Sequence, residues 1–209
     1  MARIIAYQFS PNHLTLESVD SFYNRSLASI ECRYSRNTNQ NYSNDFSDMT
    51  EDDIADEAHN LIEELQKETI FHLLAGIEAL LRIDYIVRID KKDKKPISCY
   101  FRNEYILYEQ QKKRDSKTLE YKKKENDVKW KIADKYRVDL CDVILKGWRE
   151  CYPENKTCIN LLGDAFKYRN WLAHGRYRKI DDENKYTFFL ISNIVSVFKE
   201  TIMPLLLHY

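Results

Sequence analysis

The sequence predicts an all-α fold, a bundle of about five or six helices in a single domain over residues 1–209. Apolar residues recur at spacings of three and four along most of the chain, which is the helical period. Four glycines in 209 residues are too few for the tight hairpins of a β-sandwich or for phosphate-binding glycine loops. No segment predicts a strand, and no internal repeat is found. The length suits one domain with a sizeable core.

The first predicted helix begins near Leu14. Six apolar residues follow the helical period there: Leu16, Val19, Phe22, Tyr23, Leu27 and Ile30. Residues 35–49 are rich in Asn and Ser without apolar periodicity, which predicts a loop. Thr50 then precedes three acidic residues at 51–53, so a capping hydroxyl and negative charges meet at the positive end of a second helix.

The helical pattern from about 51 to 90 is longer than most globular helices, which predicts a stretch broken once. In its second half, residues 68–88 place apolar side chains on nearly every side of the helix axis. Such a helix is normally buried at the centre of a bundle. Glu78 and Arg82 lie one turn apart in this apolar stretch, which makes the pair conspicuous.

A charged segment follows around residues 91–131. Pro96 marks a break, and the residues after it predict one or two exposed helices with little apolar stripe, a charged helical insertion in the domain. Residues 91–131 carry 14 basic and 7 acidic side chains, net +7, whereas residues 1–90 carry 7 and 16, net −9. The segment therefore either attracts polyanions or forms a solvated face of mixed charge.

Three apolar segments close the chain. Residues 139–151 predict a short amphipathic helix, and residues 156–174 predict another that ends near Gly175. Residues 185–207 predict an apolar closing helix. The best membrane candidate, the eleven residues from 188 to 198, is shorter than a membrane span and predicts a core helix. We therefore expect no membrane partner.

Cysteine usage and the N-terminus predict a cytoplasmic protein. Five cysteines, an odd number without a CxxC pair, predict neither a disulfide framework nor a zinc ribbon. Such cysteines suit reduced thiols in the cytosol. The first ten residues carry one basic side chain and too short an apolar stretch for a secretory signal.

No metal site and no cofactor are predicted. The histidines at 13, 59, 72 and 208 are isolated, and no HxxxH or HExxH pair occurs. No Ser or Cys stands in a nucleophile motif. The acidic residues between 51 and 68 fit a helix start and a solvated face better than a metal cluster.

Polar chemistry is concentrated in the stretch KYRNWLAHGRYR, residues 167–178. Asn170 and His174 are four residues apart and share a helix face, with Arg169 one step round. If the helix ends near Gly175, Arg169 and His174 can reach one site. The negative helix end favours a protonated imidazole, which can exchange protons with a reacting group. An isolated histidine also commonly makes only a structural hydrogen bond, so spacing alone leaves both interpretations open.

The string YRNWLAHGRY resembles the signature of the HEPN superfamily, in which a helix of an α-bundle carries Arg, a polar residue, several further residues and His. Arg169, Asn170 and His174 match these positions. The flanking WLAHGRY resembles the bacterial HEPN branch related to RNase LS and PSP-associated ribonucleases. GIEALLRIDY resembles an earlier core helix of that branch, with Glu78 and Arg82 at its polar positions. The resemblance covers about 30 residues directly.

This resemblance implies a metal-independent endoribonuclease, commonly a homodimer whose two motif helices meet in a composite active site. RNA supplies its own nucleophile, the 2′-hydroxyl, so cleavage to a 2′,3′-cyclic phosphate needs only proton transfer and charge stabilisation. His174 would be general base or acid, Arg169 would stabilise the phosphorane, and Asn170 would orient the histidine or the phosphate. The resemblance also implies a toxin or antiviral effector, with RNA as substrate and an antitoxin or regulatory protein as partner.

Two further groups of residues have two interpretations each. Glu78 and Arg82 either form a structural ion pair or support the active-site groove. Arg176, Tyr177 and Arg178 either bind RNA phosphates and stack a base, or form a solvated turn. Arg176 stands where related toxins carry a tyrosine that is a target of nucleotide modification, so control by that route is not expected. The alternative for the whole chain is a non-catalytic HEPN bundle that binds RNA, a nucleotide or a partner protein.

Overall fold

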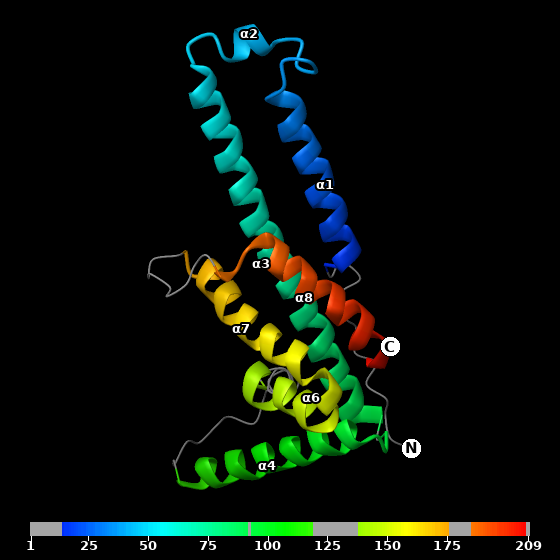
Figure 1. Cartoon of the computed structure of the whole chain (residues 1–209). Helices are drawn as coiled ribbons and strands as arrows, with labels where there is room; N and C mark the ends of the chain where they lie inside the picture. Colours follow the sequence, from blue (N-terminus) through cyan, green and yellow to red (C-terminus); the bar gives the residue numbers. More distant parts are fainter. Residues whose placement is uncertain (1–13, 92, 119–137, 176–184, 208–209) are drawn as a thin grey trace. The chain divides into compact units, whose positions relative to one another are not determined.

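The fold is that of a computed structural model, which describes residues 14–91, 93–118, 138–175 and 185–207. These residues form helices and no strand, so the prediction of an all-α helical bundle is confirmed (Figure 1). The α-helices are α1 (Leu16–Arg33), α2 (Tyr42–Asp45), α3 (Glu51–Lys91), α4 (Pro96–Thr118), α6 (Lys146–Cys151), α7 (Lys156–Ala173) and α8 (Phe188–Thr201). The other helical elements are a π-helix, η1 (Leu140–Leu145), and two 3₁₀ turns, η2 (Pro153–Asn155) and η4 (Met203–Leu205).

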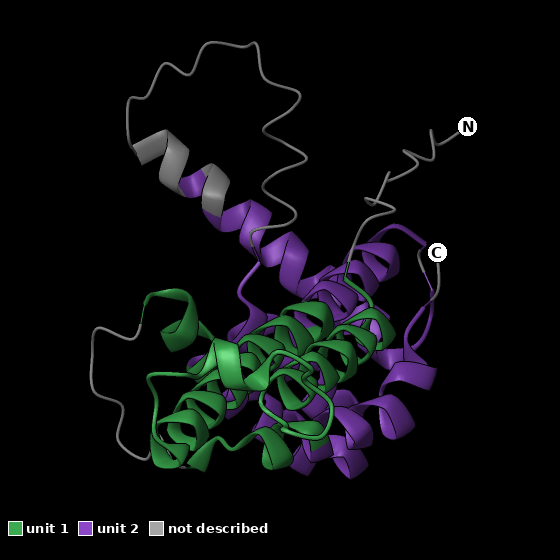
Figure 2. Ribbon diagram, turned by 90° about the horizontal axis from the view of Figure 1, so that it is seen from above, with its two compact units in different colours: residues 1–77, 168–192 green, residues 78–167, 193–209 purple. Residues whose placement is uncertain are grey.

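The chain divides into two compact units, which Figure 2 shows in green and purple. Unit 1 consists of residues 1–77 and 168–192, and unit 2 consists of residues 78–167 and 193–209. Helices α3, α7 and α8 each begin in one unit and end in the other. The unit boundaries therefore fall inside helices and not in exposed linkers, where domain boundaries usually lie. The single domain over residues 1–209 stays a prediction.

In unit 1, α1 lies beside the N-terminal half of α3, with α2 in the connection between them (Figure 1). The Tyr34 hydroxyl, just after α1, donates to a Glu57 carboxylate oxygen of α3 at 2.7 Å. A Cβ on Gly76 of α3 would lie 3.2 Å from Leu16 Cδ2, so the two helices are also close at the start of α1. Leu16 is buried, whereas Phe22 is exposed. The predicted first helix is confirmed, and its buried side chains lie in its first turns.

The start of α3 has the predicted cap. The Asp53 backbone N–H donates to Thr50 Oγ1 at 3.2 Å. The Asp53 carboxylate accepts from Thr50 Oγ1 at 2.6 Å and from the Thr50 backbone N–H at 3.0 Å. These reciprocal bonds form a capping box, and they hold the pKa of Asp53 below its usual range.

α3 continues unbroken for 41 residues, so the predicted break within this stretch is wrong. The helix contains no proline, and its single glycine, Gly76, is close to Leu16. Tertiary packing of this kind stabilises a helix beyond the length that local propensity supports. The second half of α3 is buried as predicted. Its almost completely buried apolar side chains include Leu73, Leu74, Ile77, Leu81 and Ile86.

Residues 35–49 are more ordered than the predicted loop, because they contain α2 and a buried ring. Phe46 is 5% exposed and packs against the rings of Tyr34 and Tyr42, at centroid distances of 5.2 and 5.0 Å. The Asn39 side chain donates to a main-chain carbonyl of α1 at 2.8 Å. One aromatic anchor and local hydrogen bonds therefore order this segment without any apolar period.

In unit 2, α4 and α6 approach closely at Gly147. A Cβ at that position would lie 2.5 Å from Phe101 Cε1 and 2.8 Å from Tyr100 Cδ1, so the approach requires glycine. Phe101 is fully buried and packs edge-on against Tyr85 of α3, at 5.0 Å between ring centroids. The first turns of α4 are therefore core. Its predicted exposed character begins farther along, where Leu107 is exposed.

Unit 2 also contains a buried ion pair. Asp84 and Arg88 are both inaccessible to solvent, and Arg88 Nε is 2.7 Å from Asp84 Oδ2. Arg88 donates to the Leu205 carbonyl at 2.7 Å, and the Leu207 N–H donates to Asp84 Oδ1 at 2.8 Å. The Arg88 guanidinium lies 5.5 Å from the centroid of the Trp148 ring, a cation–π contact. These contacts fix the C-terminal segment of the chain to α3.

The predicted helix over residues 139–151 begins as a π-helix. Asp139 Oδ1 accepts from the Asp142 N–H at 2.6 Å and caps η1, and α6 follows directly. α6 ends at Cys151, in agreement with the prediction. The π-helix was not predicted, because it is a change in main-chain hydrogen bonding that apolar spacing does not report.

α8 is the most apolar helix of the chain. By length and composition, Phe188–Leu205 is the one described segment that could cross a membrane, although Lys199 and Glu200 end its uncharged run at residue 198. A core helix can have the same composition. The buried residues of α8 and the position after it are Ile191, Ile194, Val195, Phe198 and Ile202. Their helical spacing is that of a helix with one face in a core.

Candidate functional site

The candidate site is the C-terminal end of α7, in unit 1. α7 ends at Ala173. The His174 N–H donates to the Asn170 carbonyl at 3.1 Å, and the Gly175 N–H donates to the Leu172 carbonyl at 3.3 Å. Gly175 has a φ of +77°, the left-handed conformation that ends many helices. The predicted helix end is confirmed, and His174 is held just beyond the last helical residue.

Asn170, Ala173 and His174 are exposed and form a strip along this end of α7. At about 100° per residue, their side chains fall within an arc of about 100° around the helix axis. Arg169 and Trp171 are half-buried and flank the strip on its two sides. By this projection, Asn170 and His174 fall on one exposed face, and Arg169 falls at its margin.

The pKa of Arg169 is shifted by its surroundings. Its burial lowers the pKa of the guanidinium from the usual 12.5. A guanidinium nevertheless stays cationic in proteins at neutral pH. A half-buried cation attracts an anion more strongly than a fully solvated one, because the surrounding dielectric constant is lower. Arg169 therefore suits contact with a phosphate.

Three aromatic rings stack at the same end of α7. Tyr168 packs against Trp171 at 5.4 Å between ring centroids and against Tyr186 at 4.8 Å. The Lys185 ammonium lies 5.9 Å from the Tyr186 ring centroid. The stack ties the residues just before α8 to the end of α7. Tyr168 and Trp171 are one turn apart in the sequence, whereas nothing local indicates the contact with Tyr186, 18 residues from Tyr168.

The three predicted RNA-binding residues Arg176, Tyr177 and Arg178 lie outside the described residues. Their contacts with RNA stay a prediction. Near this end of α7, the structure describes the chain up to Gly175 and again from Lys185 to Leu207.

Glu78 and Arg82 form a half-buried ion pair in unit 2. Arg82 Nε is 2.7 Å from Glu78 Oε1, and Arg82 Nη1 donates to the Val138 carbonyl at 2.9 Å. Burial lowers the pKa of Arg82. Together these contacts hold α3 to the segment before η1, which favours the structural interpretation of the pair. The role of Glu78 and Arg82 as support for a groove beside His174 stays a prediction.

The acidic residues at the start of α3 contribute to its cap. Asp53 bonds to Thr50, as described above, and Glu51 pairs with Arg36. Within the described ranges, no group of three or more His, Cys, Asp and Glu side chains is arranged to hold a metal ion. The contacts of Glu51 and Asp53 are those of a helix start.

Comparisons with protein-family models, with curated proteins and with solved structures find no match for this chain. The fold and the site define an all-α bundle with an Arg, Asn and His cluster at one helix end. The resemblance to HEPN proteins therefore rests on the residues of that cluster and of the central helix.

Proposed function

We propose that this chain is a metal-independent endoribonuclease of the HEPN type that acts in the cytoplasm as a homodimer. The observation that carries the proposal is the end of α7, where Asn170 and His174 share an exposed strip and Arg169 lies at its margin. Cleavage through the ribose 2′-hydroxyl needs a group that transfers protons and a cation that stabilises the phosphorane. An imidazole and a guanidinium supply both.

In the proposed reaction, the protein takes one proton from the RNA and returns one proton to it. His174 of one protomer takes the proton of the 2′-hydroxyl, and the 2′-oxygen bonds to the adjacent phosphorus. The bond from phosphorus to the 5′-oxygen breaks, and His174 of the partner subunit gives a proton to that oxygen. The products are a 2′,3′-cyclic phosphate and a 5′-hydroxyl. Arg169 stabilises the charge on the phosphorane, and Asn170 orients the imidazole or the phosphate.

The role of a toxin or antiviral effector, with an antitoxin or regulatory protein as partner, is proposed from the resemblance to HEPN proteins. Cleavage of this kind needs no cofactor, because the RNA carries the nucleophile. Such an enzyme would cut RNA wherever it meets it. A partner protein is therefore needed to restrain it.

The test is cleavage of end-labelled RNA in excess EDTA. We expect the wild-type protein to leave 2′,3′-cyclic phosphate ends and His174→Ala to lose at least about 100-fold in rate, the lower range of general acid–base catalysis. His59→Ala is the matched control, because His59 is also an exposed histidine, on α3. That variant should keep full activity. RNA with a 2′-deoxy sugar at the cleavage position should not be cut there.

Two outcomes would contradict the proposed mechanism. One is activity that requires a divalent ion. The other is equal activity in wild type and His174→Ala, which would assign the cleavage to another site or to a contaminant. Arg169→Gln adds a separate readout: kcat should fall while KM changes little, because the charge it stabilises develops mainly in the transition state.

A non-catalytic HEPN-like bundle that binds RNA, a nucleotide or a partner protein is the second candidate. Trp171 and Tyr186, which are half-buried and stack on the buried Tyr168, favour its RNA-binding form, because aromatic rings beside a polar strip can stack bases whether or not cleavage follows. This candidate predicts that wild type and His174→Ala bind RNA with equal affinity and that neither cuts it.

A further inference from the structure

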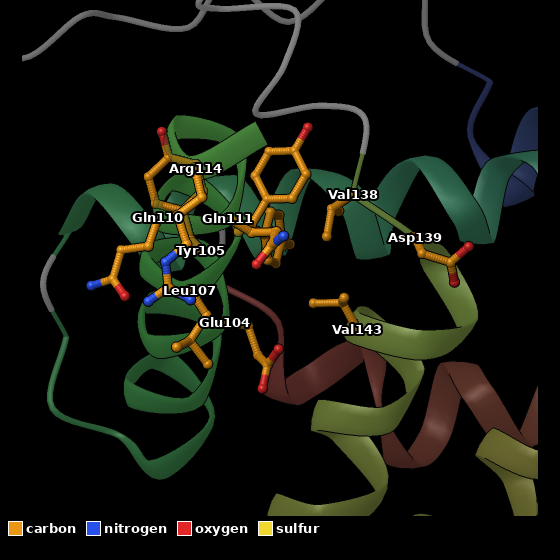
Figure 3. Close-up of a pocket in the computed structure, with 11 residues that line it drawn as sticks. Glu104, Tyr105, Leu107, Gln110, Gln111, Arg114, Val138, Asp139 and Val143 are labelled. Atoms are coloured by element: carbon orange, nitrogen blue, oxygen red, sulfur yellow. The ribbon is translucent and has the colours of Figure 1, made fainter. Parts of the chain in front are cut away.

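A pocket in unit 2 lies between α4 and the segment around the start of η1 (Figure 3). Its volume is about 560 Å³, within the range of small-molecule sites. α4 forms one wall, Val138, Asp139 and Val143 form the other, and Tyr85 of α3 also lines it. The lining includes none of the proposed catalytic residues.

Much of the pocket wall is apolar or aromatic. Leu107 and Tyr108 of α4 are exposed although both side chains are large. Val138 and Val143 point toward α4 from the opposite wall (Figure 3). Tyr105 adds a further ring. Tyrosine rings attract both apolar groups and cations placed over their faces.

Two polar groups of the pocket have no partner among the described residues. Tyr85 is 2% exposed, and within the described ranges its hydroxyl makes no hydrogen bond. The half-buried Glu104 carboxylate makes neither a hydrogen bond nor an ion pair with any described residue. A hydroxyl oxygen and a carboxylate without a protein partner can each accept a hydrogen bond from a ligand in the pocket. Burial, followed by the nearby Tyr105 and Glu104, raises the pKa of Tyr85, so its hydroxyl is neutral.

The other charged residues of the lining do not neutralise Glu104. Asp139 caps η1 through the Asp142 N–H, and its carboxylate points away from α4 (Figure 3). Arg114 follows Glu104 by ten residues on the same helix, about 15 Å along the axis at 1.5 Å per residue. Among the described residues, no cation lies beside Glu104.

We infer that this pocket binds a small organic cation, a protonated amine on an apolar or aromatic body. The ammonium donates to the Glu104 carboxylate and to the Tyr85 hydroxyl oxygen. The body lies against Leu107, Tyr108 and Val143. This arrangement gives both unpartnered polar groups a hydrogen bond, and it covers exposed apolar surface. An anion in the same place would face the like charge of Glu104.

Three probes of similar shape and different charge test this inference on the full-length protein. 2-Phenylethylamine is the cation, 2-phenylethanol is the neutral probe and 3-phenylpropionate is the anion. Isothermal titration calorimetry measures their binding, and the amide NMR shifts of α4 locate it. We expect the amine to bind at least about tenfold more tightly than the alcohol, because a charge-assisted hydrogen bond contributes about that much. The propionate should bind most weakly.

Glu104→Gln should weaken binding of the amine about tenfold and leave the alcohol unchanged. Tyr85→Phe should weaken the amine by a smaller factor, and circular dichroism verifies the fold of both variants. Glu109→Gln is the matched control, because Glu109 is on the same helix and does not line the pocket. The inference is overturned if none of the probes binds saturably, if the alcohol or the propionate binds as tightly as the amine, or if Glu104→Gln binds the amine as wild type does.

Discussion

Gly175 is the residue on which the geometry of the candidate site depends. Its φ of +77° lets α7 stop directly after Ala173 and leaves His174 exposed at the helix end. Chain neighbours aside, a Cβ on Gly175 would meet no atom of the described residues within 4 Å. The strain of any other residue there would therefore come from the backbone alone, since left-handed conformations are unfavourable for L-amino acids.

Gly175→Ala should lower the free energy of unfolding by about 1 kcal/mol, the cost of a left-handed alanine. Urea denaturation followed by circular dichroism measures the change. Gly163→Ala is the control in the interior of the same helix, where a Cβ would lie 3.6 Å from Leu145 Cδ1, an ordinary contact. It should raise the free energy of unfolding by about 0.5 to 1 kcal/mol. The opposite order of the two variants would mean that the end of α7 is misassigned.

The capping box of Thr50 and Asp53, at the start of α3, predicts that the stability of the fold depends on pH. Hydrogen bonds from Thr50 lower the pKa of Asp53 from the usual 3.8. A carboxyl whose pKa is lower in the folded state stabilises that state above pH 3.8, and the contribution is lost as the pH falls through the folded value. An NMR titration should find the Asp53 pKa below 3.8 in wild type and closer to 3.8 in Thr50→Ala. Equal pKa values in the two proteins would contradict the cap.

Among the elements, the second half of α3 is fixed by its buried ion pair. Arg88→Met should lower the free energy of unfolding by about 3 to 5 kcal/mol, because it leaves the Asp84 carboxylate buried without its cation. Arg82→Met is the comparison one and a half turns earlier. The Arg82 and Glu78 side chains are 29% and 18% exposed, so water replaces part of the lost pairing and the effect should be smaller. Urea denaturation of both variants decides the order, and an equal loss would mean that burial of the Asp84 pair contributes nothing extra.

Helix ends that are fixed by residues close in the sequence were predictable from the sequence. Thr50 caps α3 with a side chain three residues from its partner, and Gly175 ends α7 through its own backbone angle. The spacing of Asn170 and His174 likewise predicted a shared helix face, whereas their role in a site stays a prediction. These features need only the residue and its immediate neighbours, so spacing and residue type were sufficient to find them.

Features that depend on contacts between distant segments were not predictable in the same way. α3 continues without the expected break, and Gly76 within it packs near Leu16, some 60 residues away in the chain. The order of residues 35–49 depends on the burial of Phe46. At the candidate site, Tyr186 joins the ring stack from beyond a segment that separates it from α7. No local pattern reports such contacts, because the partner can be any apolar or aromatic residue of the chain.

Over the whole molecule, charge is segregated although the formal net charge is zero. Residues 1–90 carry net −9 and residues 91–131 carry net +7. A polyanion such as RNA is repelled by the first region and attracted by the second. If the protein is a ribonuclease, the basic segment is the part of the chain that should hold RNA by sequence-independent contacts, whereas the end of α7 should act on one phosphate.

The basic segment can be tested by replacing Lys122, Lys123 and Lys124 with glutamine in a His174→Ala background that does not cut RNA. Each phosphate neutralised on single-stranded RNA contributes about 0.7 to the slope of log K against log salt concentration, so the slope should fall in magnitude by about 2. Fluorescence anisotropy with a labelled oligonucleotide measures it. Glutamine at Lys146, Lys156 and Lys199 makes the same change of charge outside the segment and should leave the slope nearly unchanged. Equal slopes for the two triple variants would mean that residues 91–131 form a solvated face of mixed charge, and RNA would then have to be held elsewhere on the molecule.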